Sequence, residues 1–360
     1  MNLKDIENLI YGNLEKVKVS ESKEEFLELS DPILDRLIFG KGFPLHSIIQ
    51  FTGNPHSYKS SFASNIAGML KRNNKCVVLY LDSEHSMRKE RLLQLGLDIE
   101  KIITGITVEK VSGILYTLAD TLEKNKELQE YPFVIIWDSV AATPTEAELN
   151  SDDINKTIGL KARILSALIP KWISEIFSKY RVSLLTINQL RDKVQMNPYA
   201  PPGIGLKNLG DKTLPGGNAL QYLSSLILEN RVRTEFDEST PYGFKGKVVE
   251  VKTVKNKYFI DNLKIDLIFS PITGYVPSFS QFELLKGYKK VVSSGPVWKF
   301  ESDKNVSFRL RELNKKLVED KEFREFWILQ LNDVIDTLIK NATFTSSPST
   351  ESSIELDDIE

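Results

Sequence analysis

The chain has 360 residues, of which 41% are hydrophobic and 27% are charged, and its formal net charge is −2. This composition is typical of a soluble globular protein, and the length suits one large domain plus a small one. There is no apolar run near the ~20 residues of a membrane span, no secretion signal and only one cysteine, Cys76, so we expect a cytoplasmic protein without an internal disulfide.

An amphipathic helix is predicted at the N-terminus, where Leu3, Ile6, Leu9 and Ile10 form one apolar stripe. A charged stretch over residues 15–28 then separates this helix from a core that begins at Asp31. We expect residues 1–30 to be a helix and tether that packs either on its own core or on a neighbouring subunit.

Residues 53–60 read Gly-Asn-Pro-His-Ser-Tyr-Lys-Ser, which is one residue away from the phosphate-binding loop pattern. Tyr58 stands where the second glycine is expected, and a bulky residue disfavours the positive φ that such a position can need. A buried strand over 47–51 and a helix over 61–70 flank the loop, so backbone N–H groups would point at an anion. Lys59 would reach the β- and γ-phosphates, and the Ser60 hydroxyl would bind Mg²⁺. The ATP contacts predicted here are Gly53, Asn54, Pro55, His56, Ser57, Tyr58, Lys59, Ser60 and Ser61; the alternative is an ordinary strand-to-helix turn that contains a lysine.

Acidic side chains follow two further apolar strands. The strand over 77–81 ends in Asp82-Ser83-Glu84-His85, and these acids suggest a general base that orients water. The strand over 133–137 ends in Asp138, which could hold Mg²⁺ together with Ser60. In both places the alternative is that the acid only caps a helix, which near the first strand would span about residues 88–95.

A fourth apolar strand over 182–187 ends in Asn188-Gln189. Four such strands separated by helical stretches predict an α/β fold with a doubly wound, mostly parallel sheet.

The strand ends, in this order, resemble those of the RecA-type DNA strand-exchange recombinases. The stretches that carry the resemblance are Leu79–His85, Trp137–Ala142, Ile187–Arg191, Gly216–Leu220 and Val254–Lys257. The resemblance runs from about residue 31 to about residue 299. The aromatic residue before Lys59 is similar to one that bacteriophage recombinases of the T-even type carry there, which indicates a phage origin.

The resemblance implies roles for several residues. Glu84 would activate the attacking water, Gln189 would sense the γ-phosphate, and Lys59 completes the expected catalytic set. Lys255 and Lys257 would reach the ATP of the neighbouring subunit; without the resemblance they are alternate residues on a polar strand face. Arg91 stands where the family commonly stacks a tyrosine on adenine, and Arg88 where it has an aspartate, so base specificity is open although a guanidinium can stack on a base.

Two segments match the DNA-binding loops of that family. The first spans about residues 149–158, and the second, which is rich in proline and glycine, spans about 190–217. Each could also be a solvated loop. The residues expected to contact DNA are Lys156, Ile158, Arg163, Arg191, Lys193, Gly216, Gly217 and Asn218.

The resemblance places the ATPase core at residues 31–269. A small C-terminal domain is expected over 270–340, with helices at 280–290 and 306–340. Residues 341–360 read as a disordered acidic tail, since 351–360 contain five acidic and no basic residues. The tail would either aid solubility or compete with DNA for basic surface.

The resemblance as a whole implies an ATP-dependent homologous recombination protein. It would form a head-to-tail helical filament on single-stranded DNA, pair it with homologous double-stranded DNA, and hydrolyse ATP with Mg²⁺ under DNA stimulation. Mediator and single-strand-binding proteins are possible partners, and the cytoplasm of a bacterium or a phage-infected host is the expected location. A RecA-fold ring helicase or motor and a non-hydrolysing recombination mediator remain alternatives, and the slightly acidic net charge is the main argument against a DNA-binding protein.

Overall fold

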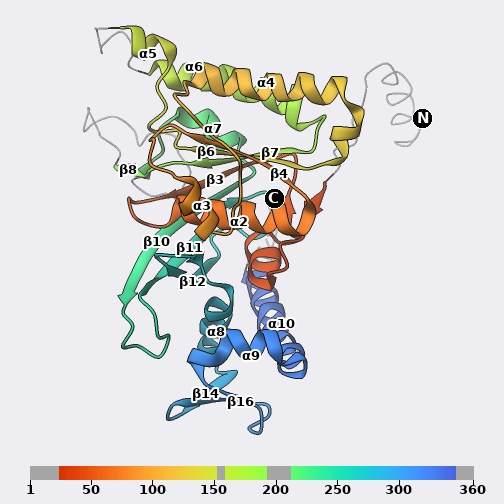
Figure 1. The fold of residues 1–360 in the computed structure, drawn as a ribbon, viewed down its shortest axis with the longest axis vertical. Helices are drawn as coiled ribbons and strands as arrows, with labels where there is room; N and C mark the ends of the chain where they lie inside the picture. The colour runs from red at the N-terminus through yellow and green to blue at the C-terminus, as the bar shows by residue number, and fades with distance from the viewer. Residues whose placement is uncertain (1–23, 152–158, 193–211, 346–360) are drawn as a thin grey trace, which may run out of the picture.

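A nine-stranded sheet forms the centre of the computed structural model, which describes residues 24–151, 159–192 and 212–345 (Figure 1). Its strands from β10 to β5 run parallel, whereas β10 to β13 pair antiparallel. In spatial order they are β13 (Gly274–Tyr275), β12 (Lys264–Ser270), β11 (Gly246–Asn256), β10 (Leu226–Phe236), β3 (Ile48–Gly53), β7 (Val182–Ile187), β6 (Phe133–Asp138), β4 (Val77–Asp82) and β5 (Ile102–Thr104).

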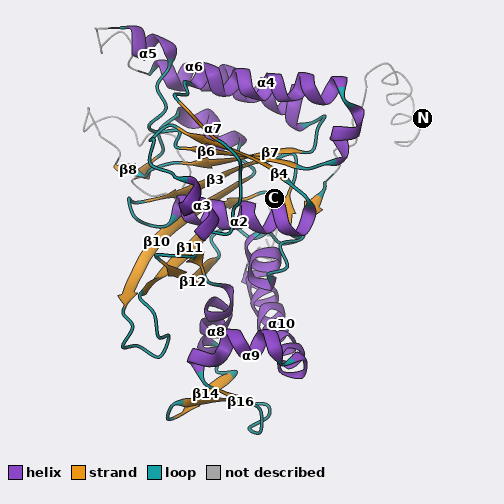
Figure 2. Ribbon diagram, in the orientation of Figure 1, coloured by secondary structure: helices purple, strands orange, loops and turns teal. Residues whose placement is uncertain are grey.

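Helices cover both faces of this sheet because its central strands are apolar on both sides (Figure 2). In β6, Val134 and Ile136 belong to one core cluster, while Ile135 and Trp137 belong to the cluster on the opposite face. The first face is covered by α2 (Lys59–Asn74) and α3 (Lys89–Gln94). The second is covered by α4 (Val108–Lys124), α6 (Leu160–Trp172) with its continuation η4 (Ile173–Phe177), and α7 (Gly217–Leu223). The predicted doubly wound α/β fold is confirmed.

The register of the parallel strands brings their polar ends to one edge of the sheet. Asp82 pairs with Asp138, and Asp138 in turn pairs with Ile187, directly before the Asn188-Gln189 end. On the other side of β7, Gly53 at the end of β3 pairs with Asn230 in β10. Sequence-distant segments therefore meet at a single edge, where open α/β sheets bind their ligands.

Residues 24–30 belong to the core, which differs from the tether predicted for this stretch. β1 (Phe26–Leu27) pairs with β2 (Phe43–Pro44), and Leu27 and Leu29 are buried. The segment is rich in charged residues, and for this reason the sequence did not predict that its two leucines are buried. They pack next to η1 (Ile33–Ile38). The predicted N-terminal helix and the first part of the predicted tether lie outside the described residues.

The C-terminal region begins later than predicted and contains a small sheet. β13 joins the central sheet beyond residue 269, and the predicted helix over 306–340 is interrupted at Asp320, whose carboxylate accepts a hydrogen bond from the Phe323 N–H at 2.9 Å. Such capping starts a new helix. The elements are α8 (Pro277–Gly287), β14 (Val291–Ser294), β15 (Val297–Phe300), β16 (Ser307–Phe308), η6 (Leu310–Glu312), α9 (Leu313–Glu319) and α10 (Lys321–Thr345). The disordered tail was predicted to begin at 341, but α10 continues to Thr345, and residues 346–360 lie outside the described residues.

Shorter elements occur in the connections: η2 (Lys126–Glu130), α5 (Glu146–Asn150), β8 (Arg191–Asp192) and β9 (Lys212–Thr213). Within the described ranges, no helix combines the length and the apolar character needed to cross a membrane.

Candidate active site

The turn after β3 has the backbone of a phosphate-binding loop. Gly53 has a φ of 145°, and a Cβ added there would lie 2.3 Å from the Asn230 carbonyl oxygen, so only glycine fits. The helix α2 begins at Lys59, immediately after the loop. Its first N–H groups have no partner within the helix, which makes this end suited to an anion.

Tyr58 adopts the left-handed conformation that the pattern assigns to glycine, with φ 62° and ψ 22°. Such a conformation costs a non-glycine residue about 1–2 kcal/mol. The ring packs against Phe269 at a centroid distance of 5.1 Å, a contact of the kind worth about 0.5–1.5 kcal/mol. The departure from the pattern is thus accommodated locally by aromatic packing.

Lys59 is directed at the loop and is largely shielded from water, with 7% of its surface exposed. Its Nζ donates to the carbonyl oxygen of Asn54 at 2.7 Å and to Ser57 Oγ at 3.4 Å. Burial lowers the pKa of Lys59 to about 8, although the charges of Asp138 and Glu84 oppose the shift. The ammonium group is therefore close enough to both acids to feel their charge.

We expect ATP affinity of the DNA-free protein to fall as pH rises through about 8, because deprotonation of Lys59 removes a cation from the phosphate site. The dissociation constant of a fluorescent ATP analogue, measured from about pH 6.5 to 9.5, checks this. Lys59→Arg keeps its charge over this range and should lose most of the pH dependence. A wild-type dissociation constant that stayed flat would contradict the assignment.

Asp138 and Ser60 lie together and offer oxygen atoms of the type that Mg²⁺ prefers. Burial raises the pKa of Asp138 to about 6, while hydrogen bonds from the hydroxyls of Ser60 and Tyr80 oppose the shift. Tyr80 donates to Asp138 Oδ2 at 2.7 Å. The carboxylate is therefore ionised at neutral pH and held in place, so these two residues fit a Mg²⁺ ion bound to a nucleotide.

Glu84 is the exposed acid next to this pair. Ser139 Oγ donates to Glu84 Oε1 at 2.6 Å, and Ser83 Oγ donates to the Ser139 carbonyl oxygen at 2.9 Å. Asp82, by contrast, is buried and its carboxylate accepts from the N–H groups of Glu84 and Met87. Of the two acids at the end of β4, Asp82 therefore shapes the turn and Glu84 is available to a water molecule.

Asn188, the buried residue directly before Gln189, joins the two ends of the second predicted DNA loop. Asn188 Nδ2 donates to the Pro215 carbonyl oxygen at 2.8 Å, and Asn188 Oδ1 accepts from the Gln189 N–H at 3.1 Å. The Asn188 N–H also donates to the carbonyl oxygen of Phe51, two residues before the end of β3. No role was predicted for Asn188 from the sequence, although it directly follows a predicted strand and precedes Gln189.

The predicted DNA-binding residues that the structure describes fall into two groups. Arg163 and Asn218 are exposed on the first turns of α6 and α7. Gly216 and Gly217 instead face α6: a Cβ would lie 3.2 Å from Leu165 at the first and 2.8 Å from Ala162 at the second. Close packing thus explains both glycines without any ligand.

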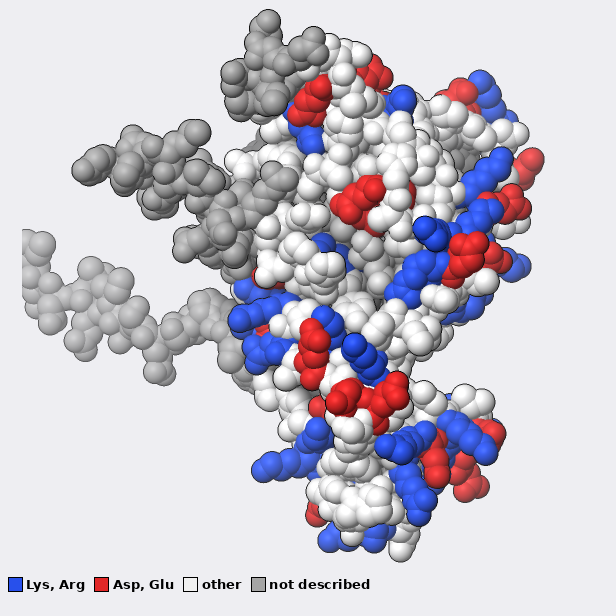
Figure 3. Space-filling model, turned by 60° about the vertical axis from the view of Figure 1, so that its left-hand side comes forward, with Lys and Arg blue, Asp and Glu red and all other residues white. Residues whose placement is uncertain are grey.

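The remaining predicted DNA contacts are only partly described. The backbone of Arg191 lies in β8, which pairs with β9 and closes the base of the second loop. Lys156, Ile158 and Lys193 lie outside the described residues. Figure 3 shows basic and acidic side chains interspersed over one face of the molecule rather than a single continuous basic surface.

Arg91 borders the phosphate loop. Its Nη1 donates to the Ile272 carbonyl oxygen, and its charge acts on the Tyr58 hydroxyl. Arg88 is exposed directly before α3. The position of Arg91 is compatible with stacking on a nucleotide base.

Lys255 and Lys257 lie at the opposite edge of the sheet from the phosphate loop of their own chain. Lys255 pairs with Ile227 near the start of β10, whereas the phosphate loop begins beside Asn230. Lys255 Nζ donates to the Tyr222 carbonyl oxygen at 2.5 Å, and burial lowers its pKa to about 8. The structure does not bring these lysines to the site within one subunit.

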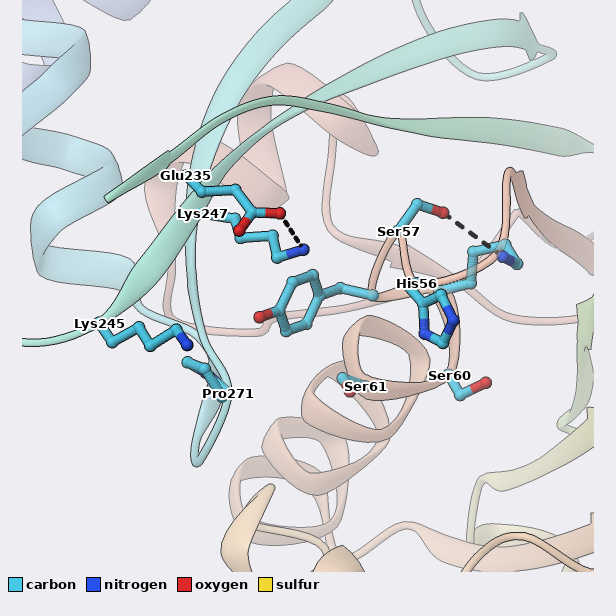
Figure 4. A pocket seen from close by; sticks show the side chains of 10 residues that line it. His56, Ser57, Ser60, Ser61, Glu235, Lys245, Lys247 and Pro271 are labelled. Atoms are coloured by element: carbon cyan, nitrogen blue, oxygen red, sulfur yellow. Dashed lines mark hydrogen bonds and ion pairs between the residues drawn. The ribbon is translucent and has the colours of Figure 1, made fainter. Parts of the chain in front are cut away.

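A pocket of about 530 Å³ opens over the phosphate loop, and its lining includes four residues that the sequence did not suggest (Figure 4). They are Glu235, Lys245, Lys247 and Pro271. In the sequence, Lys245 and Lys247 are recognisable only as two alternating lysines at the start of a strand. Their spacing does not show that this strand reaches the phosphate loop.

Comparisons with known proteins identify the family of this chain. A family model described as the RecA N-terminal domain matches residues 3–271. Protein RecA of Borrelia hermsii is 27% identical over 335 residues, covering 90% of this chain and 87% of that protein. Protein RecA of Borrelia turicatae is 28% identical over 304 residues (82% and 77%), and that of Mycoplasmopsis pulmonis is 32% identical over 216 residues (60% and 58%).

Proposed function

Since this chain belongs to the RecA family, we propose that it is a DNA-dependent ATPase that pairs and exchanges homologous DNA strands. It would assemble head to tail on single-stranded DNA with ATP and Mg²⁺, engage homologous double-stranded DNA, and release the filament after hydrolysis. The observation that carries this proposal is the convergence of Lys59, Ser60, Glu84 and Asp138 at one sheet edge.

Each of these residues has a distinct task in the proposed hydrolysis. Lys59 and the first N–H groups of α2 bind the phosphates, and Ser60 with Asp138 would hold Mg²⁺. The metal ion would supply positive charge to the phosphate oxygens, as in other phosphoryl-transfer enzymes. Glu84, oriented by Ser139, accepts a proton from the attacking water.

Gln189 would couple the phosphate site to DNA. The backbone N–H of Leu190 donates to the Gly53 carbonyl oxygen at 3.3 Å, so the segment that follows β7 is attached directly to the phosphate loop. The same segment leads into the loop that β8 and β9 close. A change in the position of Gln189 on contact with the γ-phosphate would therefore move β8 and β9, which form the base of the proposed DNA loop.

Lys255 and Lys257 would complete the site of the neighbouring subunit. We expect Lys255→Ala to retain ATP binding but lose DNA-stimulated hydrolysis, because the cation that acts on the phosphates comes from another chain. Mixing Lys255→Ala with Lys59→Ala subunits should restore part of the ATPase activity. Such mixtures contain interfaces with an intact loop on one side and an intact lysine on the other. Mixtures that remain inactive, in spite of normal co-assembly on DNA, would contradict the assignment in trans.

The N-terminal segment and the exposed Tyr222 are the proposed partners in filament assembly, and mediator and single-strand-binding proteins would assist loading. A phage origin, suggested by Tyr58, stays a hypothesis, since the relatives reported above are bacterial. The protein would act in the cytoplasm of a bacterium or infected host. Electron microscopy that showed closed rings on DNA would favour a motor instead.

A further inference from the structure

The hairpin of β10 and β11 extends beyond the end of β3, and its far end lines the pocket over the phosphate loop. β10 pairs with β3 only as far as Asn230, yet it continues with β11 to the pair formed by Phe236 and Gly246. The end of the hairpin therefore extends past β3, and β12 accompanies β11 as far as the pair formed by Lys247 and Phe269 (Figure 1). Lys245 and Lys247, two positions apart, both line the pocket over the loop.

Aromatic packing fixes this projecting end. Phe236 contacts Tyr242 and Phe244 at ring-centroid distances of 4.5 Å and 5.5 Å, and Phe244 contacts Phe279 of α8 at 5.3 Å. Tyr242 also donates a hydrogen bond to Glu283 of α8 at 2.5 Å. The two lysines are thus carried by an anchored element, which favours a defined contact with a ligand.

The pocket carries an excess of positive charge. Its lining includes the lysines Lys59, Lys245 and Lys247 but a single carboxylate, Glu235. Glu235 and Lys247 are opposite each other in the hairpin and form an ion pair of 2.5 Å, with 63% of the glutamate side chain and 23% of the lysine side chain exposed. In Figure 4 the hairpin residues face Ser60 and Ser61 across the pocket. Such a site favours a ligand with several negative charges.

We propose that Lys245 and Lys247 bind the polyphosphate of the nucleotide from the same subunit, and that Glu235 competes with the phosphates for Lys247. The inference rests on the proposed ATP-binding function. Lys245 and Lys247 would contact the phosphates from the hairpin side of the pocket, in addition to the contacts made by Lys59. Lys247 would exchange its bond with Glu235 for one with a phosphate oxygen, and Glu235 would thereby limit the affinity for ATP.

The test is nucleotide binding by the full chain, measured in the absence of DNA with fluorescent ATP and AMP analogues. Lys247→Met should weaken ATP binding about tenfold, the loss expected for a hydrogen bond between charged groups, and should weaken AMP binding much less. Lys245→Met should act in the same direction. Glu235→Gln should tighten ATP binding about two- to fivefold, as expected for removal of an exposed ionic competitor. In a Lys247→Met background, Glu235→Gln should have no further effect.

Lys264→Met removes an exposed lysine of the same sheet that does not line this pocket, and it should leave binding unchanged. If the hairpin variants all bind ATP like wild type while Lys59→Ala binds poorly, the hairpin proposal is wrong and the ATP site stands. If Lys247→Met weakens ATP and AMP equally, the polyphosphate assignment is overturned. If wild type does not bind ATP, the proposed function itself fails.

Discussion

Lys59→Ala should reduce ATP hydrolysis by about a hundredfold or more, the loss expected when a preorganised charge partner of the reacting group is removed. The reason lies in the position of the ammonium group. Lys59 is buried, hydrogen-bonded to the loop at Asn54, and close enough to Asp138 and Glu84 for their charges to act on its pKa. Steady-state phosphate release in Mg²⁺, with saturating single-stranded DNA, measures the effect.

The matched control for Lys59 is Lys71→Ala. Lys71 lies on the same helix, is exposed, and its Nζ donates to the Asp98 carbonyl oxygen far from the loop. This variant should hydrolyse ATP at nearly the wild-type rate. Retention of full ATPase activity by Lys59→Ala would refute the phosphate-loop assignment.

Glu84→Gln should separate ATP binding from hydrolysis. The amide preserves the size of the side chain and can still accept a hydrogen bond from Ser139, but it cannot take a proton from water. We expect ATP affinity close to wild type and a turnover number lower by about 10²–10⁴, the contribution typical of a general base. Filaments on single-stranded DNA should then persist long after wild-type filaments have dissociated.

Binding and single-turnover hydrolysis, measured on the same preparation, check both parts of this prediction. Glu90→Gln on α3 changes an exposed glutamate that does not line the pocket, and should behave like wild type. Wild-type turnover by Glu84→Gln would show that another group activates the water.

The parallel half of the fold could be predicted because each element carries a local signal. The apolar runs at 77–81, 133–137 and 182–187 end in polar residues, and the rule that ligands bind at the carboxyl ends of parallel strands brings those residues together. The register confirms this placement for Asp82 and Asp138.

The antiparallel half could not be predicted in the same way because its pairings are not local. Glu235 and Lys247 become neighbours only through the register of β10 and β11, and their contact with the phosphate loop depends on how far the hairpin projects beyond β3. Similarly, the left-handed backbone of Tyr58 depends on its packing with Phe269, which is distant in sequence.

The central claim is that a DNA-responsive ATPase operates at the edge formed by Lys59, Asp138 and Gln189. The most direct test is ATP hydrolysis by the purified protein in Mg²⁺, with and without single-stranded DNA. We predict strong stimulation by DNA, since the phosphate loop and the second predicted DNA loop are joined through Asn188 and Leu190. Hydrolysis at the same rate with and without DNA would contradict this account.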